Sequence, residues 1–165
     1  MKIAICPGSF DPVTVGHVDI IRRAVKMFDH VIVAVMVNPS KHPAFTLEER
    51  EGLLTRALKG MPKIEIVGFD GLLADYARER NATAIVKGLR AVSDFEYEFQ
   101  MALVNKKLAP QTETVFLVTS TQNLYVSSSL VKQVAQFGGD ISDFVPEQIL
   151  PDVTRKLSAG RNNQE

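Results

Sequence analysis

The chain has 165 residues, 45% of them hydrophobic and 23% charged, which fits one globular domain with a well-buried core. Its 19 Lys and Arg residues balance its 19 Asp and Glu residues, so no overall field favours nucleic acid or an acidic membrane surface. The single cysteine, Cys6, excludes an internal disulfide and a multi-cysteine metal site, and its place in an apolar run favours the core.

Apolar runs and helix-like segments alternate along the chain. In chain order, the apolar runs predict strands at Ile3–Cys6, Val31–Val37, Ile64–Val67, Ala84–Val86 and Thr114–Val118. The segments between and after them predict helices at Gly16–Phe28, Leu47–Lys59, Leu72–Arg80, Asp94–Leu108 and Ser128–Phe137. Because the apolar runs are continuous, each strand should be buried on both faces, as in a parallel sheet. The order therefore predicts a doubly wound α/β fold with a five-stranded parallel sheet.

Local signals mark several helix ends. Thr46–Glu49 and Ser93–Glu96 each place Glu three residues after a hydroxyl residue, which is the pattern of a capping box. The pair Gly138–Gly139 should end the fifth helix. A last helical piece is expected after Pro146, interrupted by Pro151.

No internal repeat or low-complexity linker divides the chain. We therefore expect one domain over residues 1–158, followed by a frayed tail at 159–165. The N-terminus lacks a signal-peptide pattern, and the longest apolar run, Val31–Val37, is too short to cross a bilayer. These features lead us to expect a soluble, cytoplasmic protein.

The polar clusters of the sequence follow predicted strands. They lie at Ser9–His17, Asn38–His42, Lys87–Arg90 and Ser120–Ser129. Ligands of a doubly wound sheet bind beyond the carboxyl ends of its strands, where the strand order reverses. If the first and fourth strands are central neighbours, all four clusters share one edge of the sheet, and a single ligand site is expected there.

The segment Pro7–His17, which joins the first strand to the first helix, is the most informative part of the chain. If the helix begins near Val15, Thr14 and His17 point from its first turn into the same space. Exposed N–H groups and the positive end of the helix dipole favour an anion such as phosphate there. The ordinary alternative is a histidine that only caps or packs, but the dipole disfavours a protonated ring unless an anion is present.

Three cations lie near the same predicted edge. Lys41 can reach a phosphate as a mobile charge, although a solvated loop lysine is the ordinary alternative. Lys87 and Arg90 place two cations around Gly88, which lets the backbone approach a ligand closely. Arg90 can also pair with a carboxylate of the following helix.

The run Ser127–Ser129 opens the fifth helix and offers hydroxyls and free N–H groups to a polyphosphate, although single serines are ordinary N-caps. The sequence lacks the patterns of a P-loop, a dinucleotide-binding turn, a zinc protease and a nucleophile elbow. Two helix N-termini, one histidine and several cations favour transfer between phosphates, because such reactions depend on positioning and charge stabilisation. The hypothesis is a nucleotidyltransferase in which an acceptor phosphate attacks the α-phosphorus of ATP.

Longer blocks of sequence narrow this hypothesis. They are Pro7–His17, Phe45–Arg50, Gly88–Glu98 and Ser127–Lys132. Together they resemble the bacterial phosphopantetheine adenylyltransferase family of the T/H-x-G-H nucleotidyltransferases, and the similarity runs from about Lys2 to Leu157. The resemblance implies a Rossmann-like nucleotidyltransferase fold. It also implies transfer of the adenylyl group of ATP to 4′-phosphopantetheine, giving dephospho-coenzyme A and pyrophosphate in coenzyme A biosynthesis.

The resemblance also implies roles for residues at matching positions. The implied catalytic residues are His17, Lys41 and Arg90. The implied ATP contacts are Ser9, Phe10, His17, Gly88, Leu89, Arg90, Glu98, Asn123, Leu124, Tyr125, Val126, Ser127, Ser128 and Ser129. The implied acceptor contacts are Ser9, Lys41, Leu73 and Lys87, where Lys87 replaces an arginine of many members and keeps the charge without the bidentate fork. Kinship further implies Mg²⁺, a homohexamer and feedback inhibition by coenzyme A. The sequence shows no carboxylate cage, which is consistent with Mg²⁺ carried mainly by ATP oxygens and water. The balanced charge leads us to expect no nucleic-acid or membrane partner.

Two alternatives remain open at this point. Another adenylyl- or cytidylyltransferase of the superfamily, acting on nicotinamide mononucleotide or glycerol phosphate, is the enzymatic alternative. The loop after the second strand and the block Gly88–Glu98 argue against it. A non-catalytic nucleotide-binding module is the other, since many α/β domains bind ATP without turnover.

Overall fold

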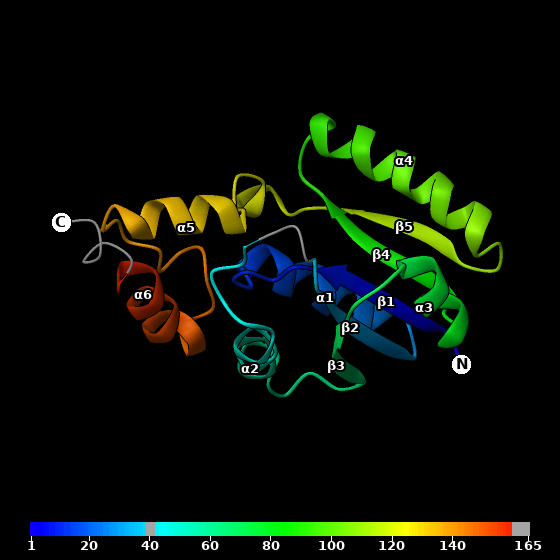
Figure 1. Ribbon diagram of the computed structural model, residues 1–165, viewed down its shortest axis with the longest axis horizontal. Coiled ribbons are helices and arrows are strands. Elements are labelled where there is room, and N and C mark those ends of the chain that lie inside the picture. The colour runs from blue at the N-terminus through cyan, green and yellow to red at the C-terminus, as the bar shows by residue number, and fades with distance from the viewer. Residues whose placement is uncertain (39–41, 160–165) are drawn as a thin grey trace.

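The computed structural model describes residues 1–38 and 42–159. Across them, five strands form one sheet in the order β3-β2-β1-β4-β5, and every neighbouring pair is parallel (Figure 1). The strands are β1 (Ile3–Gly8), β2 (His30–Met36), β3 (Ile64–Phe69), β4 (Ala84–Leu89) and β5 (Glu113–Val118). The doubly wound, five-stranded α/β fold predicted from the sequence is confirmed.

The centre of the sheet positions the candidate site. β1 pairs with β2 on one side and with β4 on the other, so the strand order reverses between β1 and β4. The expected central neighbours are therefore confirmed. Because all the strands are parallel, the loops that follow them leave from the same edge of the sheet.

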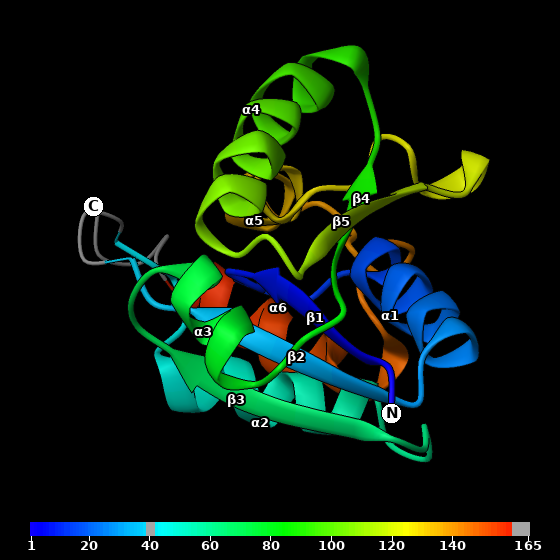
Figure 2. The ribbon, with the colours of Figure 1, turned by 90° about the vertical axis from the view of Figure 1, so that its right-hand side faces the viewer.

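Helices cover both faces of the sheet. The described helices are α1 (Val15–Met27), α2 (Leu47–Ala57), α3 (Leu73–Glu79), α4 (Val92–Leu108), α5 (Ser128–Gln136) and α6 (Leu150–Ala159). Apolar side chains of α1, α2, α5 and α6 share one buried cluster with β1 and β2, whereas α3 joins a second cluster. Figure 2 shows α1 and α3 on opposite sides of β1 and β2. α4 lies over β5, where the ring of Phe95 meets Phe116 edge-on.

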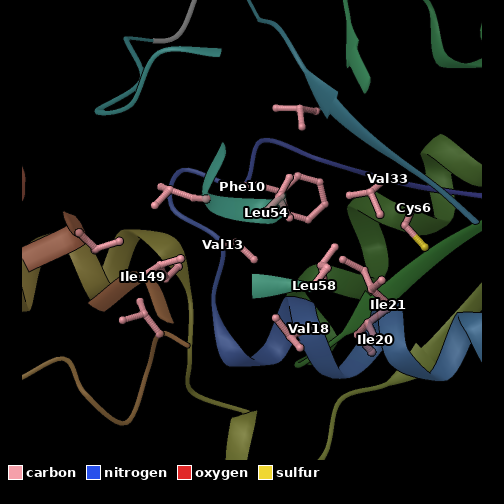
Figure 3. Packing of buried hydrophobic residues seen from close by; sticks show 14 of the residues in the cluster. Cys6, Phe10, Val13, Val18, Ile20, Ile21, Val33, Leu54, Leu58 and Ile149 are labelled. Atoms are coloured by element: carbon pink, nitrogen blue, oxygen red, sulfur yellow. The ribbon is translucent and has the colours of Figure 1, made fainter. Parts of the chain in front are cut away.

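Alternation along the strands divides the core between the two faces. Cys6 and Val33 point into the larger cluster, whereas Ile5 and Ile32 point toward α3. Figure 3 shows the larger cluster, which includes Phe10 from the turn after β1. Cys6 is 3% exposed, which confirms its place in the core, and burial raises the pKa of its thiol to about 12. The turn that carries the candidate site is therefore packed into the main core.

Two predicted helix ends are confirmed. Thr46 caps α2, and the side chain of Glu49 returns to the Thr46 backbone in a capping box. α5 ends in a Schellman motif, in which Gly138 has a φ of 76° and Gly139 donates its N–H to the carbonyl of Val134.

The end of β4 differs from the expectation. Lys87 and Gly88 were expected in a loop after the strand, but β4 continues through Leu89, because these residues pair with β5. Gly88 lines the cleft, and an added Cβ would lie 2.9 Å from Cγ1 of Ile20. The glycine therefore allows α1 to pack closely on β4.

Two helix boundaries were also predicted wrongly. α4 begins at Val92 with Ala91 as its N-cap, two residues before the expected start at Asp94, and the side chain of Ser93, from which a capping box was expected, lies outside the described part of the chain. Pro151 does not interrupt the last helix. It is the second residue of α6, where the proline ring takes the place of an N–H that has no partner within the helix. Of the expected tail at 159–165, only Ala159, the last residue of α6, is described.

The sequence predicted that its longest apolar run, Val31–Val37, is too short to cross a bilayer. In the part of the chain that the structure describes, no helix is both long and apolar enough to cross a bilayer.

Candidate active site

A cleft of about 830 Å³ opens at the carboxyl edge of the sheet, beside the reversal between β1 and β4. Segments that are far apart in the sequence meet in it: the turn after β1, the start of α1, the ends of β2 and β4, and the start of α5. Among the residues with roles implied by sequence, those lining the cleft are Ser9, Phe10, His17, Lys87, Gly88, Arg90, Glu98, Asn123, Val126, Ser127, Ser128 and Ser129. The structure thus brings together four distant polar clusters at one edge, as expected.

The first turn of α1 fixes the orientation of His17. Thr14 is the N-cap, and its hydroxyl accepts the N–H of His17 at 3.3 Å. In return, the backbone N–H of Thr14 donates to Nδ1 of His17 at 3.0 Å, which completes a capping box. A backbone N–H can only donate, so Nδ1 is the acceptor and the neutral ring carries its proton on Nε2. The ring also meets Phe10 edge-on, at 5.0 Å between centroids.

The surroundings of His17 favour the neutral ring. Burial, and after it the positive charges of Arg90 and Lys87, lower its pKa to about 4. At neutral pH the histidine is therefore an uncharged group that offers one N–H, from Nε2, to a ligand in the cleft. It is unsuited to take up a proton near pH 7.

Arg90 and Lys87 are held by carboxylates of α4. Nε of Arg90 lies 3.3 Å from Asp94, and its Nη1 donates to the carbonyl of Val126 at 3.1 Å. Nζ of Lys87 lies 3.2 Å from Glu98. A guanidinium has five N–H groups and an ammonium has three, so both cations keep donors for an anion.

The serines at the start of α5 divide their tasks. The Ser127 hydroxyl caps the helix by accepting the N–H of Leu130, and the Ser128 hydroxyl donates to the carbonyl of Pro12 at 2.7 Å. These two hydroxyls therefore fix α5 against the turn after β1. The first N–H groups of a helix have no acceptor within it. The first residues of α5 line the cleft, so their N–H groups can donate to an anionic oxygen bound there.

Several expected site residues do not line the cleft. Leu73 packs against the second core cluster, and Leu89 ends β4. Leu124 and Tyr125 are exposed, and the ring of Tyr125 meets Phe144 instead. Lys41 lies outside the described residues.

Three charged residues of the cleft were not assigned a role from the sequence. Asp11 is 5% exposed and accepts the N–H groups of Ala44 and Phe45 at 3.0 and 2.9 Å. Lys132 of α5 pairs with Asp11 at 2.9 Å. Arg50 of α2 is 4% exposed and also lines the cleft. The sequence did contain one sign that Arg50 has a special role. Arg50 lies in the apolar stripe of its helix with Leu53 and Leu54, where a charged side chain is unusual.

The carboxylates of the cleft are occupied by cations. Within residues 1–38 and 42–159, no group of three or more His, Cys, Asp or Glu side chains is placed to hold a metal ion. Asp11, Asp94 and Glu98 line the cleft and pair with Lys132, Arg90 and Lys87 respectively. This donor set suits a divalent ion that arrives already coordinated by phosphate oxygens.

Comparison with known proteins agrees with this geometry. A family model described as cytidylyltransferase-like matches residues 5–134. The chain is 58% identical over 157 residues to a phosphopantetheine adenylyltransferase of Caldanaerobacter subterraneus, with 95% of this chain and 98% of the relative covered. It is 59% identical over 156 residues to another of Alkaliphilus metalliredigens, with 94% and 99% covered. The chain belongs to the phosphopantetheine adenylyltransferase family.

A solved structure extends the comparison beyond this phosphopantetheine adenylyltransferase family. A Vibrio parahaemolyticus protein described as a candidate nicotinate-nucleotide adenylyltransferase superposes with a TM-score of 0.68 at 20% identity. The match covers 94% of this chain and 96% of the other. At that identity the likeness shows the fold alone, and it agrees with the nucleotidyltransferase fold implied by the sequence.

Proposed function

We propose that the protein transfers the adenylyl group of ATP to 4′-phosphopantetheine and releases dephospho-coenzyme A and pyrophosphate, as a step of coenzyme A biosynthesis. Relatives named phosphopantetheine adenylyltransferase at 52–59% identity over nearly the whole chain support this reaction. The structural observation that carries the proposal is a neutral His17, protonated on Nε2, that lines one cleft together with the cations Arg90 and Lys87.

The chemistry asks little of the protein by way of proton transfer. An oxygen of the acceptor phosphate forms a bond to the α-phosphorus of ATP, and the bond from that phosphorus to the bridging β-phosphate oxygen breaks. The acceptor is a phosphate monoester, which is largely ionised at pH 7, so no base has to remove a proton before attack. A histidine with a pKa of about 4 fits this reaction, because it serves as a hydrogen-bond donor.

Five polar side chains singled out from the sequence then have roles in positioning or in charge stabilisation. His17 donates from Nε2 to an oxygen of the transferred phosphoryl group as negative charge develops there. Arg90 binds the ATP phosphates while it holds the Val126 carbonyl. Lys87 and, from its predicted position, Lys41 bind the phosphate of the acceptor. The hydroxyl of Ser9 contacts both substrates, so that the attacking oxygen and the α-phosphorus are held close together.

Mg²⁺ accompanies ATP in this proposal. The cleft carboxylates Asp11, Asp94 and Glu98 already pair with cations, which supports coordination of the ion by phosphate oxygens and water. When bound, Mg²⁺ neutralises charge on the leaving pyrophosphate.

Product analysis tests the reaction directly. The protein is incubated with ATP, Mg²⁺ and 4′-phosphopantetheine, and pyrophosphate and dephospho-coenzyme A are measured. Nicotinamide mononucleotide and glycerol phosphate serve as competing acceptors in parallel reactions. We expect pyrophosphate release to depend on 4′-phosphopantetheine. Turnover with either other acceptor alone would instead support another transferase of the superfamily, and ATP binding without any turnover would support a binding module.

Assembly and inhibition extend the proposal. We propose a homohexamer whose contacts include α4, because that helix exposes large apolar side chains: Val92, Phe95, Tyr97, Phe99, Leu103, Val104 and Leu108. We also propose feedback inhibition by coenzyme A, since it contains the dephospho-coenzyme A product and can occupy the same cleft. Inhibition that is relieved by raising the substrate concentrations would support a shared site.

A further inference from the structure

Arg50 presents a problem that the proposed roles leave unsolved. It is 4% exposed and lines the cleft from α2. Within the described residues, no carboxylate pairs with it, and its hydrogen bonds there go to neutral backbone carbonyls. Burying a cation is costly unless its donors are satisfied. A charged residue kept at such a position is therefore expected to hold something in place.

What Arg50 holds is the turn that carries Ser9. Its Nη1 donates to the carbonyl of Ser9 at 2.9 Å and to that of Met36, at the end of β2, at 3.2 Å. Its Nε also lies 3.4 Å from the carbonyl of Thr46, at the start of α2. One guanidinium thus joins the turn after β1 to the end of β2 and the start of α2.

The held turn is strained. Phe10, which follows Ser9 directly, has a φ of 48°, in the left-handed region that favours glycine. Strained residues of this kind persist only where surrounding contacts fix them, and they concentrate at functional sites. Here the contacts come from both sides. Arg50 holds the residue before Phe10, and the carboxylate of Asp11, the residue after it, accepts two backbone N–H groups and Lys132.

We propose that Arg50 is a positioning residue for adenylyl transfer, acting through the backbone of Ser9. By fixing the Ser9 carbonyl it sets the direction of the Ser9 hydroxyl into the cleft. It also fixes Phe10, whose ring contacts His17 edge-on. Arg50 itself touches neither substrate in this account, which rests on the proposed adenylyltransferase function.

A purely structural role is the competing explanation, since Arg50 also joins β2 to α2. That role predicts a lower melting temperature and an unchanged rate per folded molecule. A positioning role predicts a selective loss of kcat, because small displacements of reacting groups slow chemistry more than they weaken binding. Steady-state kinetics of folded variants separates the two.

The first measurement compares Arg50→Met and Arg50→Lys with the wild type at saturating ATP and 4′-phosphopantetheine. For Arg50→Met we expect kcat to fall by roughly 10- to 100-fold, with both KM values changed by less than about threefold. Arg50→Lys should recover part of the rate, because an ammonium can still donate to the Ser9 carbonyl. The control is Arg56→Met, which removes an arginine of the same helix that pairs with Asp152 of α6. It should leave kcat and KM unchanged.

The second measurement remains informative if Arg50→Met does not fold. Ser9→Ala is made in the wild type and in Arg50→Lys, and the two losses of kcat are compared as a double-mutant cycle. If Arg50 acts through Ser9, Ser9→Ala costs a smaller factor in the Arg50→Lys background. Equal factors in both backgrounds, or a kcat for Arg50→Met within twofold of wild type, would overturn the proposal. A wild type that forms no dephospho-coenzyme A would instead overturn the proposed function.

Discussion

The turn after β1 and the helix α4 meet at the same cleft, but they are stabilised in opposite ways. In the turn, the buried polar side chains of Asp11 and Thr14 have partners within the chain, and Phe10 lies in the main core. α4 instead exposes a row of large apolar residues, with Tyr97 64% and Leu103 57% exposed. Its buried Asn105 leaves Oδ1 without a partner in the described structure. One chain is therefore sufficient to build the turn, whereas α4 is the helix that we propose to contact another chain.

The two regions are connected through the cations of the cleft. Arg90 and Lys87 come from the β4 side, but their carboxylate partners, Asp94 and Glu98, are one turn apart on α4. The position of α4 therefore affects the charges that surround His17. This connection lets the contrast be tested from either region.

The largest effect is expected in the turn itself. His17→Ala removes the preorganised Nε2–H donor and should lower kcat by roughly 10²–10³, with the fold intact. The matched control is His30→Ala. His30 begins β2, pairs with Glu65 of β3 and does not line the cleft, so kcat should stay unchanged. Product formation within twofold of wild type for His17→Ala would show that the imidazole has no chemical role.

A smaller effect is expected from α4. Leu103→Glu places a charge in its exposed apolar row and should shift the protein to smaller assemblies, as measured by light scattering. Substitutions far from a site typically change its energetic coupling to distant residues by about 0.5–2 kcal/mol. For the cleft this corresponds to a loss of roughly 2- to 30-fold in kcat/KM. Met27→Glu, at an exposed apolar position that ends α1, is the control and should leave the assembly intact. The assignment of α4 to the interface fails if both variants keep the wild-type mass.

The sequence predicted the sheet well because burial on both faces restricts a strand to continuous apolar residues, as in Val31–Val35. It also predicted the shared edge, because parallel strands place His17, Arg90 and Ser127 at their carboxyl ends. Local patterns determine such features.

The residues that the sequence left unassigned depend on distant partners. Arg50 contacts Ser9 across 41 positions of sequence, and Lys132 contacts Asp11 across 121. No local period encodes such pairs. The end of β4 was missed for a related reason, since Lys87 and Gly88 extend the strand only because β5 offers them partners.

The third prediction concerns the pKa of His17 and is the smallest in its effect on activity. Burial and the two cations should keep that pKa near 4, against an ordinary value near 6.5. Nitrogen-edited NMR should therefore show a neutral ring, protonated on Nε2, from pH 5 to pH 8. The pKa is lower in the folded state than in the unfolded chain, so the folded state resists protonation. The contribution of the neutral His17 ring to the free energy of unfolding is complete above about pH 6.5 and is lost as the pH falls toward 4. Urea unfolding at pH 7 and pH 5 should show a larger loss for the wild type than for His17→Ala.

The same titration can measure how strongly α4 acts on the turn. If α4 holds Arg90 and Lys87 near the imidazole through Asp94 and Glu98, disturbing α4 weakens the positive field at His17. The pKa of His17 in Leu103→Glu should then rise from about 4 toward 6.5, without a change in the Thr14 cap that fixes the ring. An unchanged pKa would mean that burial, Arg90 and Lys87 act on His17 in the same way whatever the assembly. In that case the turn would be electrostatically independent of the assembly, and any loss of activity in Leu103→Glu would have to arise elsewhere in the cleft.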